Sequence, residues 1–198
     1  MLTFVIFIIS YCIGSIPVGR LVARSRGIDI ENIGSGNVGA TNVARSLGKK
    51  AGLFTLFGDI AKGVLTTWLG FWFFADPFGA ALTGMLAVFG HCFSIPGVSK
   101  GGKGVATSIG VIAVLSPLLA TIAIGVFIAS FIGTRIVSVS SMAAALSVIL
   151  ALLAIPAAEP LRWPLMAVAL LVIARHRQNI GRIIEGKEQR FSLKKTRS

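Results

Sequence analysis

Charged side chains are scarce in this sequence, and their scarcity excludes most classes of soluble protein. Only 13% of the 198 residues are Asp, Glu, Lys or Arg, about half the share of a typical soluble domain, whereas 55% are hydrophobic. No polar stretch is long enough to form a separate soluble domain. We therefore expect one integral membrane domain over residues 1–198.

Acidic residues are especially few, with seven Asp and Glu against 19 Lys and Arg, and the formal net charge is +12. Lysine and arginine collect in the cytoplasmic loops of membrane proteins, so this excess indicates orientation in a membrane. It does not require a nucleic-acid partner, and we expect none.

Potential metal ligands are also few. Cys12 and Cys92 lie in or beside apolar segments without metal-ligand spacing, and we interpret both as small buried hydrophobic residues. His91 and His176 lie on separate segments with no carboxylate pair nearby. We therefore expect no metal and no cofactor.

Long apolar runs predict an all-α protein built from transmembrane helices. The first run has no basic residues before it and continues past Pro17, so we interpret it as a helix and not as a cleaved leader. A proline near the middle of the longest run predicts a kink or a turn there. The runs are Leu2–Val22, Ala51–Phe74, Phe78–Ile95, Val105–Ile132 with Ser116 and Pro117 inside it, Val137–Ile155 and Leu161–Ala174.

The distribution of charge favours seven spans over six. Basic residues follow the first and third runs, precede Val137 and fill the segment after Ala174, whereas the alternate connections contain only Asp76, Glu159 and Arg162. With a turn at Pro117, every basic segment falls on one side, as the positive-inside rule requires. We predict seven transmembrane helices with the N-terminus outside, the C-terminus in the cytoplasm, and a flexible basic tail over residues 190–198.

Three polar segments then share the cytoplasmic face: GSGNVGATN at 34–42, GHCFSIPGVSKGGKGVAT at 90–107, and RHRQNIGRIIEGKE at 175–188. Glycine lets the backbone bend so that successive N–H groups converge on an anion. Around Thr41 the spacing of alanine and valine shows no amphipathic stripe, so we expect a tight loop there. Taken alone, each segment is also compatible with an ordinary interfacial loop or with basic residues that contact anionic lipid.

The side chains of these segments suit a phosphate group. Ser35, Asn37, Thr41 and Asn42 supply donors. Lys100 and Lys103 bracket Gly101 and Gly102 just before a helix, whose N-terminus also favours negative charge. Gly97 to Lys103 matches GxxxxGK, but Gly104 replaces the Ser or Thr of a nucleotide-binding P-loop, and no strand precedes it. His176, Arg177, Asn179 and Arg182 lie within two turns of one expected helix.

Two charged residues, Asp59 and Lys62, lie three positions apart inside a predicted span and can pair on one helix face. A charge at the bilayer centre costs roughly 2.5–3.5 kcal/mol on insertion scales, which makes this pairing plausible. The pair is either a structural ion pair or a support for the phosphate site. His91 either packs at the inner end of its span or acts on the substrate.

The segments SGNVGATN, GH to KGGKGVAT, and RHRQNIGRIIEGKE together resemble the three signatures of the bacterial acyl-phosphate-dependent glycerol-3-phosphate acyltransferases, the PlsY family. The resemblance covers essentially the whole chain. It implies transfer of a fatty acyl group from acyl phosphate to the 1-hydroxyl of glycerol 3-phosphate, which gives lysophosphatidate and inorganic phosphate. It also implies a bacterial inner-membrane protein whose site faces the cytoplasm among membrane lipids, and a monomer can contain the whole site.

We assign the candidate residues to the two phosphates by position. Ser35, Gly36, Asn37, Thr41 and Asn42 are expected to hold the acyl phosphate. The phosphate of glycerol 3-phosphate is expected to bind Arg45, Lys100, Lys103, His176 and Asn179, with Lys103 able to contact both groups, and Gly101 and Gly102 are expected to belong to the substrate site. Ser35 and Asn37 join His91 and Lys103 as catalytic candidates, and the general base is either His91 or the substrate's own phosphate.

Two other classes of function remain open at this level. A small anion or organophosphate transporter also uses glycine-rich, broken helices, but its binding residues gather near the membrane midplane. A membrane scaffold with a lipid-binding basic tail does not explain three donor-rich segments on one face.

Overall fold

The computed structural model of the protein describes residues 1–97, 99–155 and 160–191, and within these ranges it contains helices and no strands. The helices are α1 (Leu2–Ser15), α2 (Val18–Arg24), the 3-10 helix η1 (Ile30–Asn32), α3 (Ala40–Leu47), α4 (Lys49–Phe74), α5 (Pro77–Cys92), α6 (Val105–Leu115), α7 (Pro117–Thr134), α8 (Val137–Ala154), α9 (Arg162–Arg175) and α10 (Arg177–Ile184). The all-helical class is therefore confirmed. Glu159 and most of the predicted tail over residues 190–198 lie outside the described residues.

Two prolines decide where apolar runs break. The run expected as one helix over Leu2–Val22 is divided, because Ile16 before Pro17 has extended backbone and α2 leaves α1 at 42°. At the second break the prediction is confirmed. Ser116 caps α7 by accepting a hydrogen bond from the N–H of Leu119, and Pro117 occupies the first turn, where its missing N–H costs nothing.

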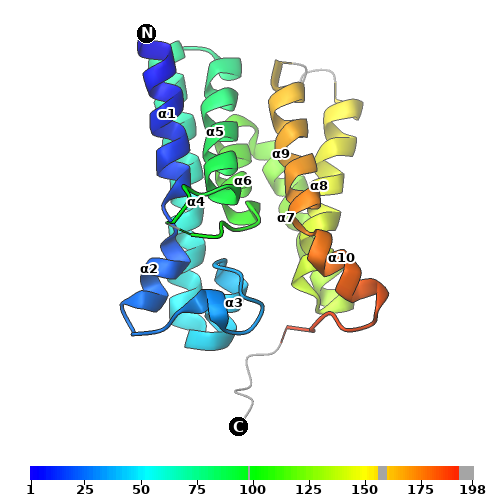
Figure 1. Cartoon of the computed structure of the whole chain (residues 1–198). Coiled ribbons are helices and arrows are strands. Elements are labelled where there is room, and N and C mark those ends of the chain that lie inside the picture. Colours follow the sequence, from blue (N-terminus) through cyan, green and yellow to red (C-terminus); the bar gives the residue numbers. More distant parts are fainter. Residues whose placement is uncertain (98, 156–159, 192–198) are drawn as a thin grey trace.

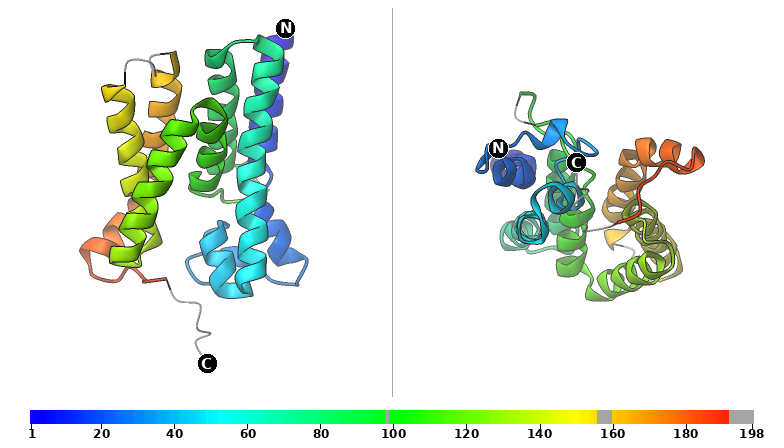
Figure 2. Two further views of the ribbon diagram at one scale, coloured as in Figure 1. Left: turned by 180° about the vertical axis from the view of Figure 1, so that it is seen from behind. Right: turned by 90° about the horizontal axis from the view of Figure 1, so that it is seen from below.

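The longer helices pack as a bundle in which α1, α4 and α5 lie on one side and α7, α8 and α9 on the other (Figure 1). Helix α1 packs against α5, α4 against α5 and α6, and α7 and α9 against α8. Seen from behind, α6 runs between the two groups (Figure 2). Helices α2, α3 and α10 lie at the end of the bundle opposite the N-terminus, so the first and third polar segments share one end (Figure 1).

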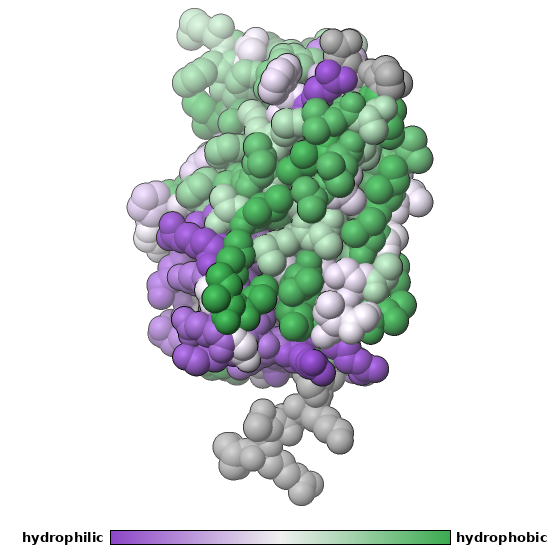
Figure 3. All heavy atoms as spheres, turned by 90° about the vertical axis from the view of Figure 1, so that its right-hand side faces the viewer, coloured by the Kyte–Doolittle hydropathy of each residue, from purple (hydrophilic) through white to green (hydrophobic). Residues whose placement is uncertain are grey.

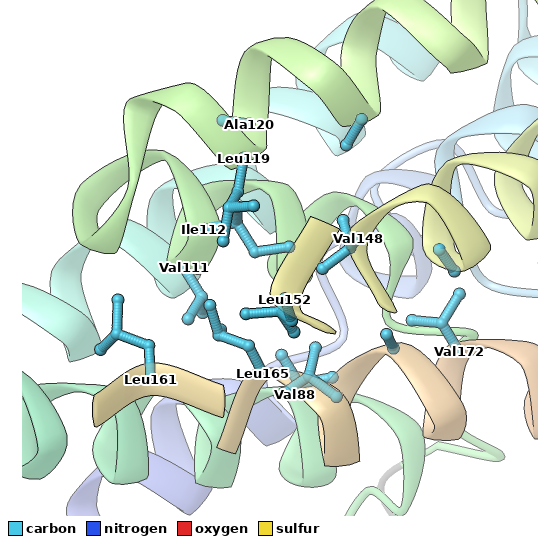
Figure 4. Close-up of a cluster of buried hydrophobic side chains, with 14 of the residues drawn as sticks. Val88, Val111, Ile112, Leu119, Ala120, Val148, Leu152, Leu161, Leu165 and Val172 are labelled. Atoms are coloured by element: carbon cyan, nitrogen blue, oxygen red, sulfur yellow. The ribbon is translucent and has the colours of Figure 1, made fainter. Parts of the chain in front are cut away.

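The main apolar core joins α5 and α6 to α7, α8 and α9. Val88, Val111, Leu119, Leu152 and Leu165 are fully or almost fully buried in it. Figure 4 shows these side chains converging from the surrounding helices. Because this core ties the two groups of helices together, it fixes the distance between the polar segments that each group carries.

The outer surface is apolar over the middle of the bundle and hydrophilic at the lower end (Figure 3). Phe57, Trp72, Ile132 and Leu153 are exposed on their helices, as expected for side chains that face lipid. Among the described helices, α7 and α8 are each long and apolar enough to cross a membrane, and the bent α1–α2 pair is a third candidate. The prediction that Cys12 is buried is wrong: it lies on the exposed face of α1, whereas Cys92 is buried.

Candidate functional site

A cavity of about 530 Å³ opens between the two groups of helices at their polar end. Its polar wall comes from all three polar segments and from polar residues of α4 and α8, whereas its apolar wall comes from α4, α6, α7, α8 and α9. The polar lining includes Ser35, Asn37, Thr41, Asn42, Arg45, Asp59, His91, Lys103, Ser138, Ser141, His176, Asn179, Arg182, Lys187, Glu188 and Gln189. The apolar lining includes Leu56, Ile60, Ile109, Ile112, Ala123, Phe127, Ala145, Val148, Val168, Ala169 and Val172.

The first polar segment forms a loop followed by a helix. Gly36 has φ 68, a conformation that a residue with a Cβ adopts only with strain. The prediction of a tight loop around Thr41 is wrong, because residues 40–47 form α3. The spacing of Val43 and Leu47, four positions apart, does give this segment an apolar face, and that face packs with Ala23 and Ile30.

Asn42 organises that loop from inside. Its side-chain oxygen accepts a hydrogen bond from the N–H of Ser35 at 3.1 Å, and its amide donates to the carbonyls of Ile33 and Asn37. The side chain of Asn37 accepts from the N–H of Gly39. The hydrogen-bonding groups of Asn42 are thus engaged with the loop backbone, although the residue lines the cavity.

The second segment carries Lys103 into the cavity, where its Nζ donates to the side-chain oxygen of Asn179. Gly104, with φ 82, turns the chain into α6 directly after it. Burial lowers the pKa of Lys103 to about 8. The charges of the neighbouring arginines also lower this pKa, whereas the charge of Glu188 raises it. Lys100 does not join this group. Its backbone N–H donates to Glu31, and neither it nor Gly36, Gly101 or Gly102 lines the cavity.

The third segment supplies a buried histidine. The Nδ1–H of His176 donates to the carbonyl of Val172 at 2.7 Å, since a carbonyl can only accept. Burial lowers the pKa of His176 to about 4, and the charge of Lys103 acts in the same direction. The imidazole is therefore neutral near pH 7, with Nε2 as an acceptor.

Glu188 completes the polar end and was not among the predicted site residues. It accepts hydrogen bonds from Ser138, Asn179 and Arg182. Burial alone would raise the pKa of Glu188, but these bonds outweigh burial and hold it below its ordinary value. Glu188 ends the third segment quoted above, but Ser138 lies inside an apolar run, and nothing in the run distinguishes it from other serines.

Arg45 links the two groups of helices across the cavity mouth. Its guanidinium donates to the side chain and the carbonyl of Gln189 and lies 5.6 Å from the ring centre of Phe191. The N–H of Phe191 donates to the carbonyl of Arg135 after α7. The segment after α10 is thereby fixed between α3 and α7.

The structure thus brings Ser35, Asn37, Thr41, Asn42, Arg45, His91, Lys103, His176 and Asn179 to one cavity. Cations outnumber carboxylates in its lining, so it suits an anion. The apolar lining continues from the polar end between α6, α8 and α9. Such a cavity can hold a molecule with a phosphate head and a hydrocarbon tail.

Comparisons with known proteins agree with this geometry. A family model described as Glycerol-3-phosphate acyltransferase matches residues 4–186. The chain is 44% identical over 187 residues to a Glycerol-3-phosphate acyltransferase of Geobacter sulfurreducens, covering 92% of this chain and 94% of that protein. It is 41% identical over 187 residues to the protein of that name from Aquifex aeolicus, covering 93% and 96%.

Two crystal structures are also similar over their whole length. Both are of PlsY, described as an integral membrane glycerol 3-phosphate acyltransferase. The glycerol 3-phosphate form has a TM-score of 0.91 at 37% identity and covers 97% of this chain and 96% of that one. The lysophosphatidic acid form has a TM-score of 0.88 at 36% identity and covers 98% and 97%.

Proposed function

This chain belongs to the glycerol-3-phosphate acyltransferase family, and we propose that it transfers a fatty acyl group from acyl phosphate to the sn-1 hydroxyl of glycerol 3-phosphate. The products are 1-acyl-glycerol 3-phosphate and inorganic phosphate, in the first step of phospholipid synthesis. The observation that carries the proposal is the cavity, whose cationic end adjoins a long apolar wall. The family match leaves the transporter alternative without support.

We assign the phosphates of the two substrates to different parts of the polar end of the cavity. Ser35, Asn37 and Thr41 lie on the α3 side and hold the acyl phosphate, while Arg45, Lys103, His176 and Asn179 hold glycerol 3-phosphate. Lys103 lies where it can contact both. We leave Lys100 out of this assignment, because its backbone is tied to Glu31 away from the cavity.

The reaction needs orientation more than acid catalysis, since phosphate is a good leaving group from an acyl phosphate. The hydroxyl oxygen forms a bond to the acyl carbon, the bond from that carbon to the phosphate oxygen breaks, and the hydroxyl proton passes to phosphate. Lys103 and the donors of residues 35–41 stabilise the oxyanion that forms between these steps, a contribution of about 100- to 1000-fold per donor.

We assign no covalent intermediate to Ser35, because its hydroxyl has no hydrogen bond to a histidine among the described residues. The substrate phosphate remains the proposed base.

The protein lies in the bacterial inner membrane with its site facing the cytoplasm, its N-terminus outside and seven spans, and it acts as a monomer among membrane lipids. The position of α2, α3 and α10 at one end supports this orientation, because the stretches that contain them, residues 18–50 and 175–190, carry 11 of the 19 Lys and Arg.

The decisive experiment uses the whole chain purified in detergent with palmitoyl phosphate and glycerol 3-phosphate. We expect equal amounts of inorganic phosphate and lysophosphatidate, abolished in Lys103→Ala and preserved in Lys50→Ala, whose side chain lies exposed outside the cavity. Palmitoyl-CoA in place of palmitoyl phosphate tests the donor. Product from palmitoyl-CoA alone would overturn the donor assignment, and no product from either donor would overturn the reaction.

A further inference from the structure

The loop over residues 99–104 carries Lys103 but is held by groups outside it. The backbone N–H of Gly102 donates to the carbonyl of His91 at 2.8 Å, and Arg175 donates to the Gly102 carbonyl at 3.0 Å. The carboxylate of Glu31 accepts hydrogen bonds from the side chain of Ser99 and from the backbone N–H of Lys100. Gly102 is therefore fixed on both its N–H and its carbonyl, one residue before Lys103.

The imidazole ring of His91 lies directly beside the Cα of Gly102. A Cβ built on Gly102 would be 2.1 Å from Nε2 of His91, so only glycine fits over this nitrogen. On its other side, Nδ1 lies 3.5 Å from a carboxylate oxygen of Asp59. The ring is only 7% exposed. Although His91 lines the cavity, its Nε2 faces Gly102 and its Nδ1 faces Asp59, whereas a general base needs a nitrogen within about 3.2 Å of the substrate hydroxyl.

Asp59 is itself fixed by a second charged group. It is 2% exposed and lies 3.0 Å from Nζ of Lys62, which is 5% exposed. Nζ also donates to the carbonyl of Ile16, where Pro17 breaks the first helix. The predicted pairing of Asp59 with Lys62 is confirmed, and Nδ1 of His91 lies near the same carboxylate oxygen. Buried charges are costly to desolvate, so a retained cluster of this kind is better explained by a requirement for geometry than by stability.

We propose that His91, whose ring lies beside Asp59 and Lys62, is a positioning residue. It fixes the position of the Gly102 backbone and thereby the position of Lys103 in the cavity. The inference rests on the proposed function, because Lys103 is taken to bind phosphate. It removes His91 from the candidates for the general base. A displacement of about 1 Å in a positioned group can cost about 100-fold in rate, so small changes at this contact have large effects.

The test is a double-mutant cycle on the contact. Gly102→Ala places a methyl group against His91, and we expect kcat/KM for glycerol 3-phosphate to fall about 100-fold, mainly through KM. His91→Ala gives the loop room and lowers kcat/KM less. The double variant removes the clash, so its activity returns to the level of His91→Ala. Gly133→Ala is the matched control, because nothing lies within 4 Å of its added Cβ.

A conservative variant separates positioning from plain destabilisation. His91→Gln keeps a donor toward Asp59, and we expect it to recover KM relative to His91→Ala while the melting temperatures of the two variants agree. Three results would overturn the proposal: a wild-type KM in His91→Ala, additive effects in the cycle, or a loss of kcat beyond about 1000-fold at unchanged KM, which identifies a general base.

Calorimetric titration with glycerol 3-phosphate tests the positioning role of His91 separately from the proposed acyltransferase function. If the wild-type protein turns over no acyl donor, the proposed function fails, but the affinities of the four proteins of the cycle, the wild type included, still test the contact. Weak binding by Gly102→Ala that His91→Ala relieves supports positioning. Equal affinities throughout overturn it.

Discussion

Lys103 and Asn179 meet at the polar end of the cavity, although 76 positions separate them along the chain. Asn179 accepts from the lysine with its oxygen and donates to Glu188 with its nitrogen, so one amide orients a cation and a carboxylate. Because the lysine is held away from water, its charge depends on pH within the physiological range. This dependence leads to the first prediction.

We expect kcat/KM for glycerol 3-phosphate to fall as pH rises through about 8. Burial lowers the pKa of Lys103 to about 8, and the protonated form is the one that binds phosphate, so activity is lost above that pH. The ratio kcat/KM reports the free enzyme, in which this pKa applies. A pH–rate profile of the purified protein is the measurement.

Lys103→Arg is the control for that profile, because arginine stays charged throughout the range. We expect Lys103→Arg to be less active than the wild type at every pH, and we expect its activity not to decline at alkaline pH. The same decline in the arginine variant would assign the titration to another group.

The neutral state of His176 gives the second prediction. Because its pKa is lowered to about 4, the ring of the unliganded protein stays neutral from pH 8 down to about pH 5. Nitrogen chemical shifts of labelled histidine follow this directly, and His176→Asn identifies the signal. A midpoint near the ordinary value of 6.5 would contradict the burial and the nearby charge of Lys103, which lower this pKa.

The third prediction concerns stability at acid pH. Glu188 has a lowered pKa, so its ionised form stabilises the folded protein above the ordinary value of 4.5 and this contribution is lost as pH falls below it. Glu188→Gln should lower the melting temperature at pH 7 and lower it less at pH 4. Glu185→Gln is the control, since Glu185 is exposed and, among the described residues, pairs with exposed Lys187. Equal effects of the two substitutions at pH 7 would contradict the prediction.

The fourth prediction tests the apolar wall. Ala145 on α8 lines the cavity beyond the polar residues, and Ala145→Phe would fill space there. We expect kcat/KM to fall about tenfold or more for palmitoyl phosphate and much less for a short acyl phosphate, since overpacking excludes the longer chain first. Leu146→Phe, on the exposed side of the same helix, should leave both substrates unchanged. Equal losses for both chain lengths would place the acyl chain elsewhere.

The sequence by itself determined the helical class, the apolar runs and the turn at Pro117, because each depends on neighbouring residues. Apolar length and composition predict helices in a membrane. The effect of proline on the backbone is local and does not depend on distant contacts. That effect differs between sites: Pro117 begins a helix, whereas Pro17 follows the end of one. The same local reasoning located the three polar segments, and the cavity draws on all of them.

Tertiary structure alone decided which members of those segments meet. Lys100 and Lys103 are equivalent by type and spacing, but Glu31 holds the backbone at one while α10 receives the side chain of the other. The apolar face of α3 is visible in its spacing, but its packing against Ala23 and Ile30 is not. Such contacts join positions far apart in the chain, and their energies exist only once the helices have packed, so no local pattern encodes them.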